Sequence, residues 1–224
     1  MTETVVLLGG TFDPVHLGHL AAAEGLSAAV AAEATWLVPS YMPPHRPAPA
    51  APAGDRLEMV QLAVADRPRL GVSACEVERR GVSFTRDTVA QLQARHPGVH
   101  FWLGLGADAA RGLPTWDHVD ELLQRVPLLL YERPGAPPLA PGWLRGRDEP
   151  TGLTRVVIDT PAVSATGVRA RLGRGDRCDD VLPAAVAAYI AAHGLYRERG
   201  PARSPRTRAG LTARRDREGG GRVG

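Results

Sequence analysis

Short apolar runs alternate with helix-like stretches along most of this chain, and that alternation constrains the fold more than any other feature. Each run is a few residues long and lacks a polar face, as expected of strands that are buried on both sides of a sheet. Six strands are expected, at 4–8, 35–38, 70–75, 99–105, 126–131 and 155–159. Helices are expected over 17–32, 55–66, 85–96 and 182–193, with a loop and a helix up to 124. Strands separated by helices predict an α/β protein with a single doubly wound parallel sheet and helices on both faces.

Composition describes an ordinary folded protein. The chain has 224 residues, of which 44% are hydrophobic and 23% charged, and this excludes wholesale disorder. No apolar run approaches the roughly 18 residues that a membrane span needs, and we see no signal-peptide layout. Cys75 and Cys178 are too few for a disulfide scaffold or a four-cysteine zinc site. We therefore expect a cytoplasmic protein without membrane contact.

The net charge of +3 divides into two unlike parts. Residues 197–224 hold nine arginines and three acidic residues, a local charge of +6, which leaves −3 for residues 1–196. The basic segment has few large apolar side chains and is rich in glycine, proline, serine and threonine, a composition typical of disorder. We expect residues 1–196 to form one domain and residues 197–224 an arginine-rich tail. Nucleic-acid binding is expected only weakly, through the tail.

The loop after the first expected strand, GGTFDPVHLGH over residues 9–19, is rich in groups that bind anions. Gly9 and Gly10 let the backbone approach a ligand closely, and Thr11 adds a hydroxyl. Free amides and the positive end of a helix dipole are expected at the start of the helix that follows. Together these groups favour a polyphosphate site.

The two histidines of this loop are expected to face the same ligand. Asp13 and Pro14 have the pattern of an N-cap followed by the first helical residue. His16 and His19 would then lie three positions apart on one face of the helix. The pair alone is a weak metal site, because no third ligand stands at suitable spacing.

A second anion loop is expected after the last strand. Ser164 or Thr166 can cap a short helix that runs to about 172, and Arg169 lies one turn along it. Hydroxyls, helix amides and a guanidinium suit the β- and γ-phosphates of ATP. Ordinary helix capping is the alternative.

Further strand-end loops carry residues with two interpretations each. Arg46 could clamp an acceptor phosphate or be solvated, and Thr85 with its neighbouring amides could hold a carboxylate or simply start a helix. Asp108, after Gly106, could accept from ribose hydroxyls or cap the next helix. Trp116 could stack on a flat ring or pack in the core.

The first loop resembles the signature of the nucleotidylyltransferase superfamily, whose T/H-x-G-H element is here His16-Leu17-Gly18-His19. The resemblance implies a Rossmann-like nucleotidylyltransferase fold and transfer of a nucleotidyl group with release of pyrophosphate. It implies that His16, His19, Thr11 and Arg169 are the catalytic residues. The segment VSATGVR at 163–169 is similar to the superfamily's I-S-S-T-x-I-R element, with Ala165 in place of its second serine.

Taken in order, the segments PPHR, SFTRDT, GADAARGLPTW and AAYIAAHGLYR resemble bacterial nicotinic acid mononucleotide adenylyltransferases over about residues 4–196. The resemblance implies that Trp116 stacks on the pyridine ring, Thr85 receives the nicotinate carboxylate, and Arg46 and Arg133 approach phosphate. It implies that Mg²⁺ arrives with ATP. The expected ATP site comprises Gly9, Gly10, Thr11, Phe12, His16, His19, Gly106, Asp108, Ser164, Thr166 and Arg169.

Two other functions stay open at this point. A phosphopantetheine adenylyltransferase shares the first motif, although such enzymes are usually shorter and lack a PTW-like element. A non-catalytic nucleotide-binding domain has no need for both imidazoles. Partners are expected to be ATP and nicotinate mononucleotide, and a homo-oligomer is left open.

Overall fold

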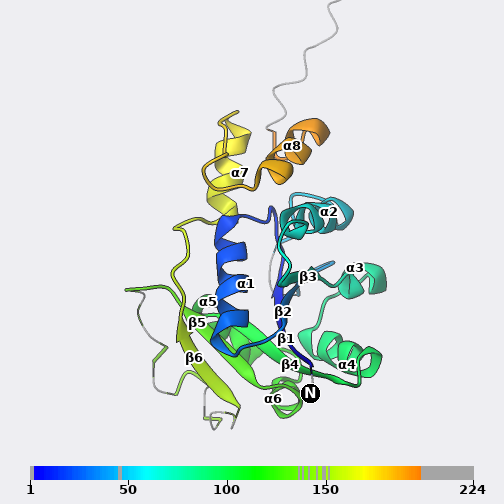
Figure 1. Cartoon of the computed structure of the whole chain (residues 1–224), viewed down its shortest axis with the longest axis vertical. Helices are drawn as coiled ribbons and strands as arrows, with labels where there is room; N and C mark the ends of the chain where they lie inside the picture. The colour runs from blue at the N-terminus through cyan, green and yellow to red at the C-terminus, as the bar shows by residue number, and fades with distance from the viewer. Residues whose placement is uncertain are drawn as a thin grey trace, which may run out of the picture.

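Six parallel strands form the centre of the computed structural model, which describes residues 3–44, 47–135, 137, 139–140, 142–144, 146–147, 150 and 152–197. The strands run in the order β3-β2-β1-β4-β5-β6, and every neighbouring pair is parallel (Figure 1). Their bounds are β1 Glu3–Gly10, β2 Ala34–Pro39, β3 Leu70–Val72, β4 Val99–Gly106, β5 Leu128–Glu132 and β6 Leu153–Val157. The predicted doubly wound parallel sheet is confirmed.

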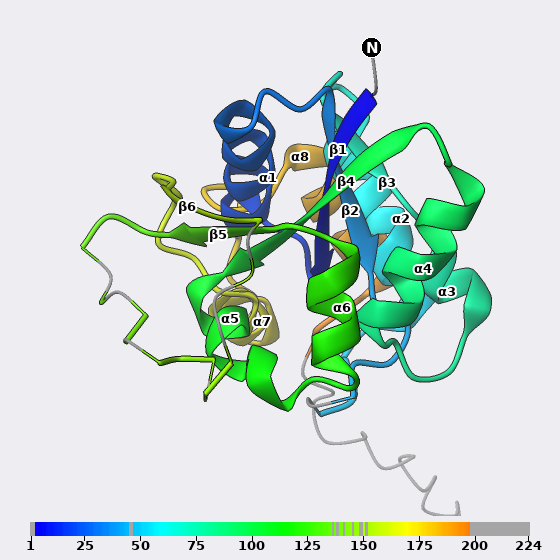
Figure 2. The same cartoon turned by 90° about the horizontal axis from the view of Figure 1, so that it is seen from below.

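Helices cover both faces of the sheet, and each face has its own core. Alternate residues of β1 point to opposite sides, so Val6 and Leu8 join one core while Val5 and Leu7 join the other. Figure 2 shows the sheet between α1 on one side and α4 and α6 on the other. The first face carries α1 (Leu17–Ala29), α2 (Ala53–Val64), α7 (Ala165–Gly173) and α8 (Ala184–His193). The second carries α3 (Cys75–Arg79), α4 (Thr85–Arg95), α5 (Ala107–Gly112) and α6 (Val119–Arg125).

The strand order places a crevice at the carboxyl ends of β1 and β4. The chain runs outward from β1 to β2 and β3, then crosses to β4 on the other side of β1. Leu8 and Gly104 are register partners near the ends of these two strands. In open α/β sheets, ligands bind at the point where the strand order reverses.

Three local expectations were wrong. The third strand ends at Val72, and Cys75 begins the short helix α3 instead of ending the strand. Helix α2 begins at Ala53, two residues before the expected start, so Asp55 lies in its first turn and accepts a hydrogen bond from the Tyr189 hydroxyl.

The third error concerns the start of α1, which begins at Leu17 with His16 at the N-cap. Asp13 does not cap this helix, because its carboxylate accepts from the amides of Ala50 and Ala51 across the cleft wall. The expected end of the last helix is correct, since Gly194 terminates α8 in the left-handed conformation with φ 62°. Within the described ranges, no helix is long and apolar enough to cross a membrane.

Candidate active site

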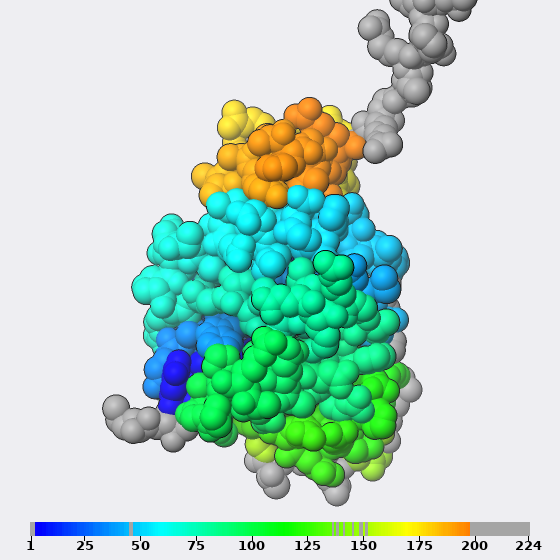
Figure 3. Space-filling model, turned by 90° about the vertical axis from the view of Figure 1, so that its right-hand side faces the viewer, coloured from blue at the N-terminus to red at the C-terminus, as the bar shows by residue number. Residues whose placement is uncertain are grey.

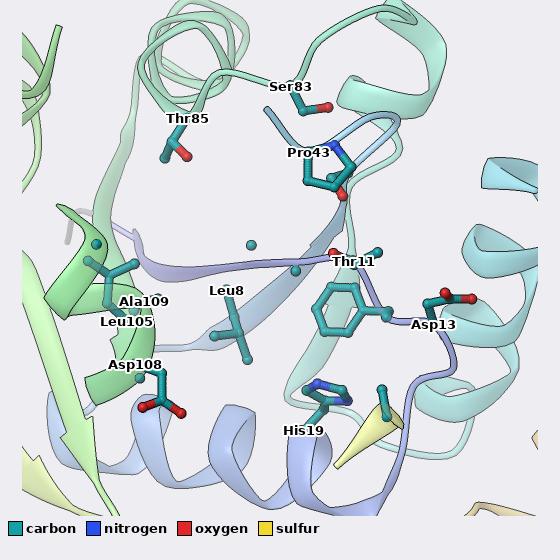
Figure 4. A pocket seen from close by; sticks show the side chains of 18 of the residues that line it. Leu8, Thr11, Asp13, His19, Pro43, Ser83, Thr85, Leu105, Asp108 and Ala109 are labelled. Carbon is teal, nitrogen blue, oxygen red and sulfur yellow. The ribbon is translucent and has the colours of Figure 1, made fainter. Parts of the chain in front are cut away.

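A cleft with a cavity volume of about 1080 Å³ opens at the carboxyl edge of the sheet. The ends of β1 and β4, the loop after β2 and the first turns of α4 and α7 contribute to its walls. In Figure 4, His19 and Asp108 lie on one side of the cavity, and Ser83 and Thr85 lie on the other. The volume is at the upper end of what small-molecule sites occupy, which leaves room for two ligands side by side.

Two imidazoles form a fixed pair at the β1 side of the cleft. The rings of His16 and His19 stack with centroids 3.6 Å apart at an angle of 18°. The backbone amide of His16 donates to Nδ1 of His19 at 3.3 Å, and the Phe12 ring meets the His19 ring edge-on at 5.0 Å. The two rings lie together at the cleft, and His16 precedes the helix instead of lying within it as expected. That both rings bind one ligand stays a prediction.

Burial keeps His16 uncharged. Its side chain is buried, and removal from water lowers the pKa of His16 to about 4, with a further contribution from the positive charge of Arg133. Nδ1 of His16 has no hydrogen-bond partner among the described residues. A buried imidazole nitrogen that is unpaired at the edge of a cleft is suited to a polar ligand.

Because Gly18 has no side chain, α1 packs closely against the segment before α7, next to the His16 ring. A Cβ atom at Gly18 would lie 2.9 Å from Cγ1 of Val163 and 3.2 Å from the His16 ring. At the end of β1, a Cβ at Gly10 would lie 2.8 Å from the Phe12 ring, whereas one at Gly9 would meet no heavy atom within 4 Å. The backbone at Gly9 is therefore open to the cleft.

The second predicted anion loop lies against the first. Ser164, the N-cap of α7, accepts from the Gly167 amide at 3.1 Å. Arg169 donates to the backbone oxygen of Asp13 at 2.7 Å and to Oγ1 of Thr166 at 3.3 Å. Both loops therefore line one cleft, and Ser164 rather than Thr166 is the capping residue.

Residues predicted for the acceptor line the same cleft. Thr85 is the first residue of α4, and the half-buried Trp116 follows a 3₁₀ turn at Leu113–Thr115. Arg133 donates to the backbone oxygen of Val163 at 3.5 Å, a weak contact. Asp108 is paired with Arg111 at 2.7 Å and is almost fully exposed. Arg46 lies outside the described residues.

Every other predicted site residue contributes to the cleft wall, including Gly106 at the end of β4. Placement in one cleft is what the structure gives, and the binding roles of these residues stay predictions.

Sequence reasoning missed the buried groups that hold the cleft loops together. The Arg56 side chain is buried and donates to the backbone oxygens of Thr11 at 2.6 Å, Tyr41 at 3.0 Å and Ala51 at 3.2 Å. Burial lowers the pKa of Arg56. Because all three acceptors are backbone atoms, one of them 45 residues away, no local pattern marked this arginine.

Another buried acidic residue lines the cleft beside α4. Glu76 accepts from the Thr88 hydroxyl at 2.6 Å, and burial raises the pKa of its carboxyl group. Among the residues that the structure describes, no group of three His, Cys, Asp or Glu side chains could hold a metal ion.

Comparison with known proteins decides the family. A sequence model described as cytidylyltransferase-like matches residues 7–171. A probable nicotinate-nucleotide adenylyltransferase of Bordetella petrii is 42% identical over 200 residues, covering 87% of this chain and all of the relative. A relative of the same name from Geobacillus thermodenitrificans is 36% identical over 191 residues, covering 85% of this chain and 84% of the relative. The chain belongs to the nicotinate-nucleotide adenylyltransferase family.

Solved structures of other proteins share the fold of this member of the nicotinate-nucleotide adenylyltransferase family. The Plasmodium falciparum nicotinic acid mononucleotide adenylyltransferase, solved in complex with NaAD, superimposes with a TM-score of 0.71 at 18% identity. The match covers 87% of this chain and 97% of the other. The predicted Rossmann-like fold and nucleotidyltransferase class are confirmed, and the family is the one that the sequence motifs predicted.

Proposed function

We propose that this chain transfers the adenylyl group of ATP to nicotinic acid mononucleotide, forming deamido-NAD and pyrophosphate in NAD biosynthesis. The observation that carries the proposal is the meeting of two anion loops in one cleft. The stacked pair His16 and His19 lies beside the α7 loop with Arg169, and the first turn of α4 faces them across the cavity.

The reaction exchanges one phosphorus–oxygen bond for another. A phosphate oxygen of the mononucleotide attacks the α-phosphorus of ATP, and the bond from that phosphorus to the bridging oxygen breaks. Pyrophosphate leaves with the electron pair. No covalent bond to the protein is needed, so positioning and electrostatic stabilisation supply the catalysis.

The β1 side of the cleft is proposed to hold ATP. His16 and His19 would donate hydrogen bonds to the transferring phosphoryl group, with Thr11 beside them. Arg169 and the α7 residues Ser164 and Thr166 would receive the β- and γ-phosphates. A neutral His16 acts in this scheme as a hydrogen-bond donor rather than as a cation, in keeping with its lowered pKa.

The opposite side of the cleft is proposed to hold the acceptor. Thr85 and the amides at the start of α4 would receive the nicotinate carboxylate, because the helix dipole favours a negative charge there. Trp116 offers a ring for stacking on the pyridine, while Arg133 and Arg46 would approach phosphate. Asp108 and Gly106, at the end of β4, are proposed to contact the adenosine part of ATP.

A divalent cation, which we expect to be Mg²⁺, would neutralise phosphate charge when ATP is bound. The described residues offer no cage of carboxylates for it, so phosphate oxygens and water are its expected ligands.

The proposal is tested by incubating the enzyme with ATP and either nicotinate or nicotinamide mononucleotide and identifying the product by mass. We expect deamido-NAD and pyrophosphate from the acid. His19→Ala should lower the rate by about two to four orders of magnitude, because a donor to the developing charge is lost. His100→Ala is the matched control, since His100 is exposed and does not line the cleft.

No product from either mononucleotide would overturn the acceptor assignment. Equal loss of rate in the His19 and His100 variants would overturn the role of His19.

A further inference from the structure

The C-terminal end of the described chain reaches back to the first loop of the cleft. The hydroxyl of Tyr196 donates to Oδ1 of Asp13 at 2.8 Å, although the two residues are 183 positions apart. Asp13 is only 5% exposed, so this carboxylate depends on its hydrogen-bond donors. Figure 4 shows the Asp13 carboxylate pointing away from the cavity, which gives it a role behind the cleft wall.

Asp13 connects several parts of the ATP side of the cleft. Its carboxylate accepts from the amides of Ala50 at 2.7 Å and Ala51 at 3.0 Å, in the loop after β2. Its backbone oxygen accepts from Arg169 at 2.7 Å. A shift of Asp13 would therefore move both Arg169 and the wall formed by the loop after β2.

A second contact braces the same loop from behind. The amide of Leu17, the first residue of α1, donates to the backbone oxygen of Val181 at 2.9 Å. In Figure 3 the C-terminal helix lies on the cyan α2 region. The segment 181–196 thus supports the loop that carries His16 at two separate points.

We propose that Tyr196 is a positioning residue for ATP, acting through Asp13 on Arg169 and on the loop after β2. The inference rests on the proposed function, because it assigns the phosphates to this side of the cleft. Burial and the nearby Asp13 charge raise the pKa of Tyr196 above its usual range, so its hydroxyl remains a donor at working pH.

The chain supplies a matched control for this contact. Tyr189 on α8 also donates to an aspartate at 2.8 Å, but its partner Asp55 lies on α2 and does not line the cleft. Both tyrosines thus join the C-terminal segment to the body through one phenol–carboxylate bond. Only the bond from Tyr196 ends on a residue of the cleft.

The test compares the steady-state kinetics of Tyr196→Phe and Tyr189→Phe, each checked by thermal unfolding. We expect Tyr196→Phe to raise the KM for ATP about five- to tenfold, as expected for the loss of one intramolecular hydrogen bond. The KM for nicotinate mononucleotide should rise less than the KM for ATP, because of the proposed acceptor residues only Arg46 belongs to the loop after β2, whereas Thr85 begins α4 and Trp116 follows the 3₁₀ turn. Tyr189→Phe should leave both KM values unchanged.

A merely structural role gives a different pattern. Loss of folded protein lowers the apparent kcat alone and leaves both KM values unchanged, and that result for Tyr196→Phe would overturn the proposal. Equal changes in the two variants would also overturn it. Failure of the proposed function is separately visible, since the wild-type enzyme would then make no deamido-NAD.

Discussion

Protonation determines what His16 can do in the cleft. With a pKa of about 4, this imidazole is neutral near pH 7 and offers one N–H donor and one acceptor nitrogen. A bound polyphosphate brings negative charge close to the ring, and nearby negative charge favours the protonated form. We therefore expect the pKa of His16 to rise when ATP binds, which strengthens its hydrogen bond to the nucleotide.

Acid is expected to destabilise the empty enzyme through His16. The pKa is about 4 in the folded state against 6.5 for an ordinary histidine, so the unfolded chain binds more protons between these values. The stability contribution is present above pH 6.5 and is lost as the pH falls toward 4. His16→Gln, which takes up no proton, should reduce the acid-induced fall in the free energy of unfolding by about 2 to 3 kcal/mol.

Urea unfolding at pH 7 and pH 4.5 measures this difference. His100→Gln is the control, because His100 is exposed and should leave the pH dependence of the wild type intact. Parallel pH profiles for the wild type and His16→Gln would contradict the prediction.

Single residues also show which parts of the site a sequence can reveal. His16 and His19 are separated by three positions, so their proximity follows from local geometry. Ser164 caps its own helix for the same reason. Arg56 and Asp13 act through partners 45 and 183 residues away, and nothing in the local pattern indicates such a pairing.

At the scale of elements, the cleft depends on how closely α1 approaches the segment before α7. Gly18 stands at this contact, where its missing side chain leaves room for Val163 and the His16 ring. Helix propensity alone would favour alanine here. Packing therefore outweighs propensity at this position.

Gly18→Ala is expected to destabilise the fold by about 1 to 3 kcal/mol, because the added methyl group must displace a neighbour. It should also lower kcat at least about tenfold, since the His16 ring is one of those neighbours. Gly54→Ala on α2 is the matched control, because a Cβ there meets no heavy atom within 4 Å. That variant should gain up to about 1 kcal/mol with unchanged activity.

Urea unfolding and steady-state rates of the two variants are the measurements. A Gly18 variant as stable and active as the Gly54 variant would show that the contact has room to relax.

The strands and long helices were predictable because apolar periodicity is a local property. The short helix α3 at Cys75–Arg79 was missed, since five residues hold too little of a helical repeat to be recognised. The start of α1 was misplaced for a tertiary reason. Aspartate is a common helix-capping residue, but the carboxylate of Asp13 accepts hydrogen bonds from amides 37 and 38 positions further along.

At the scale of the whole molecule, every predicted site residue that the structure describes lines one cleft, from Gly9 to Arg169 along the chain. The strand order brings β1 and β4 together at the centre of the sheet. Near the C-terminal end of the described residues, the Tyr196 hydroxyl contacts Asp13 at the cleft. The division into a domain at 1–196 and a tail at 197–224 stays a prediction.

A chain that ends at Arg197 is expected to transfer adenylyl groups at the rate of the full chain, because the tail supplies none of the cleft residues described above. Weak DNA binding at low salt, measured by fluorescence anisotropy, should disappear with the arginines of the tail. A large loss of transfer rate in the shortened chain would show instead that the tail takes part in the reaction.

The buried Arg56 has a consequence for how the enzyme exchanges its ligands. The Arg56 guanidinium donates hydrogen bonds to both the loop after β1 and the loop after β2. Outward movement of either loop would break these bonds and leave a buried charge without its partners, which is costly. The backbone of this part of the cleft wall is therefore held in place at Thr11, Tyr41 and Ala51. We expect any widening of the cleft for product release to occur at the opposite wall, which includes Thr85 and Trp116.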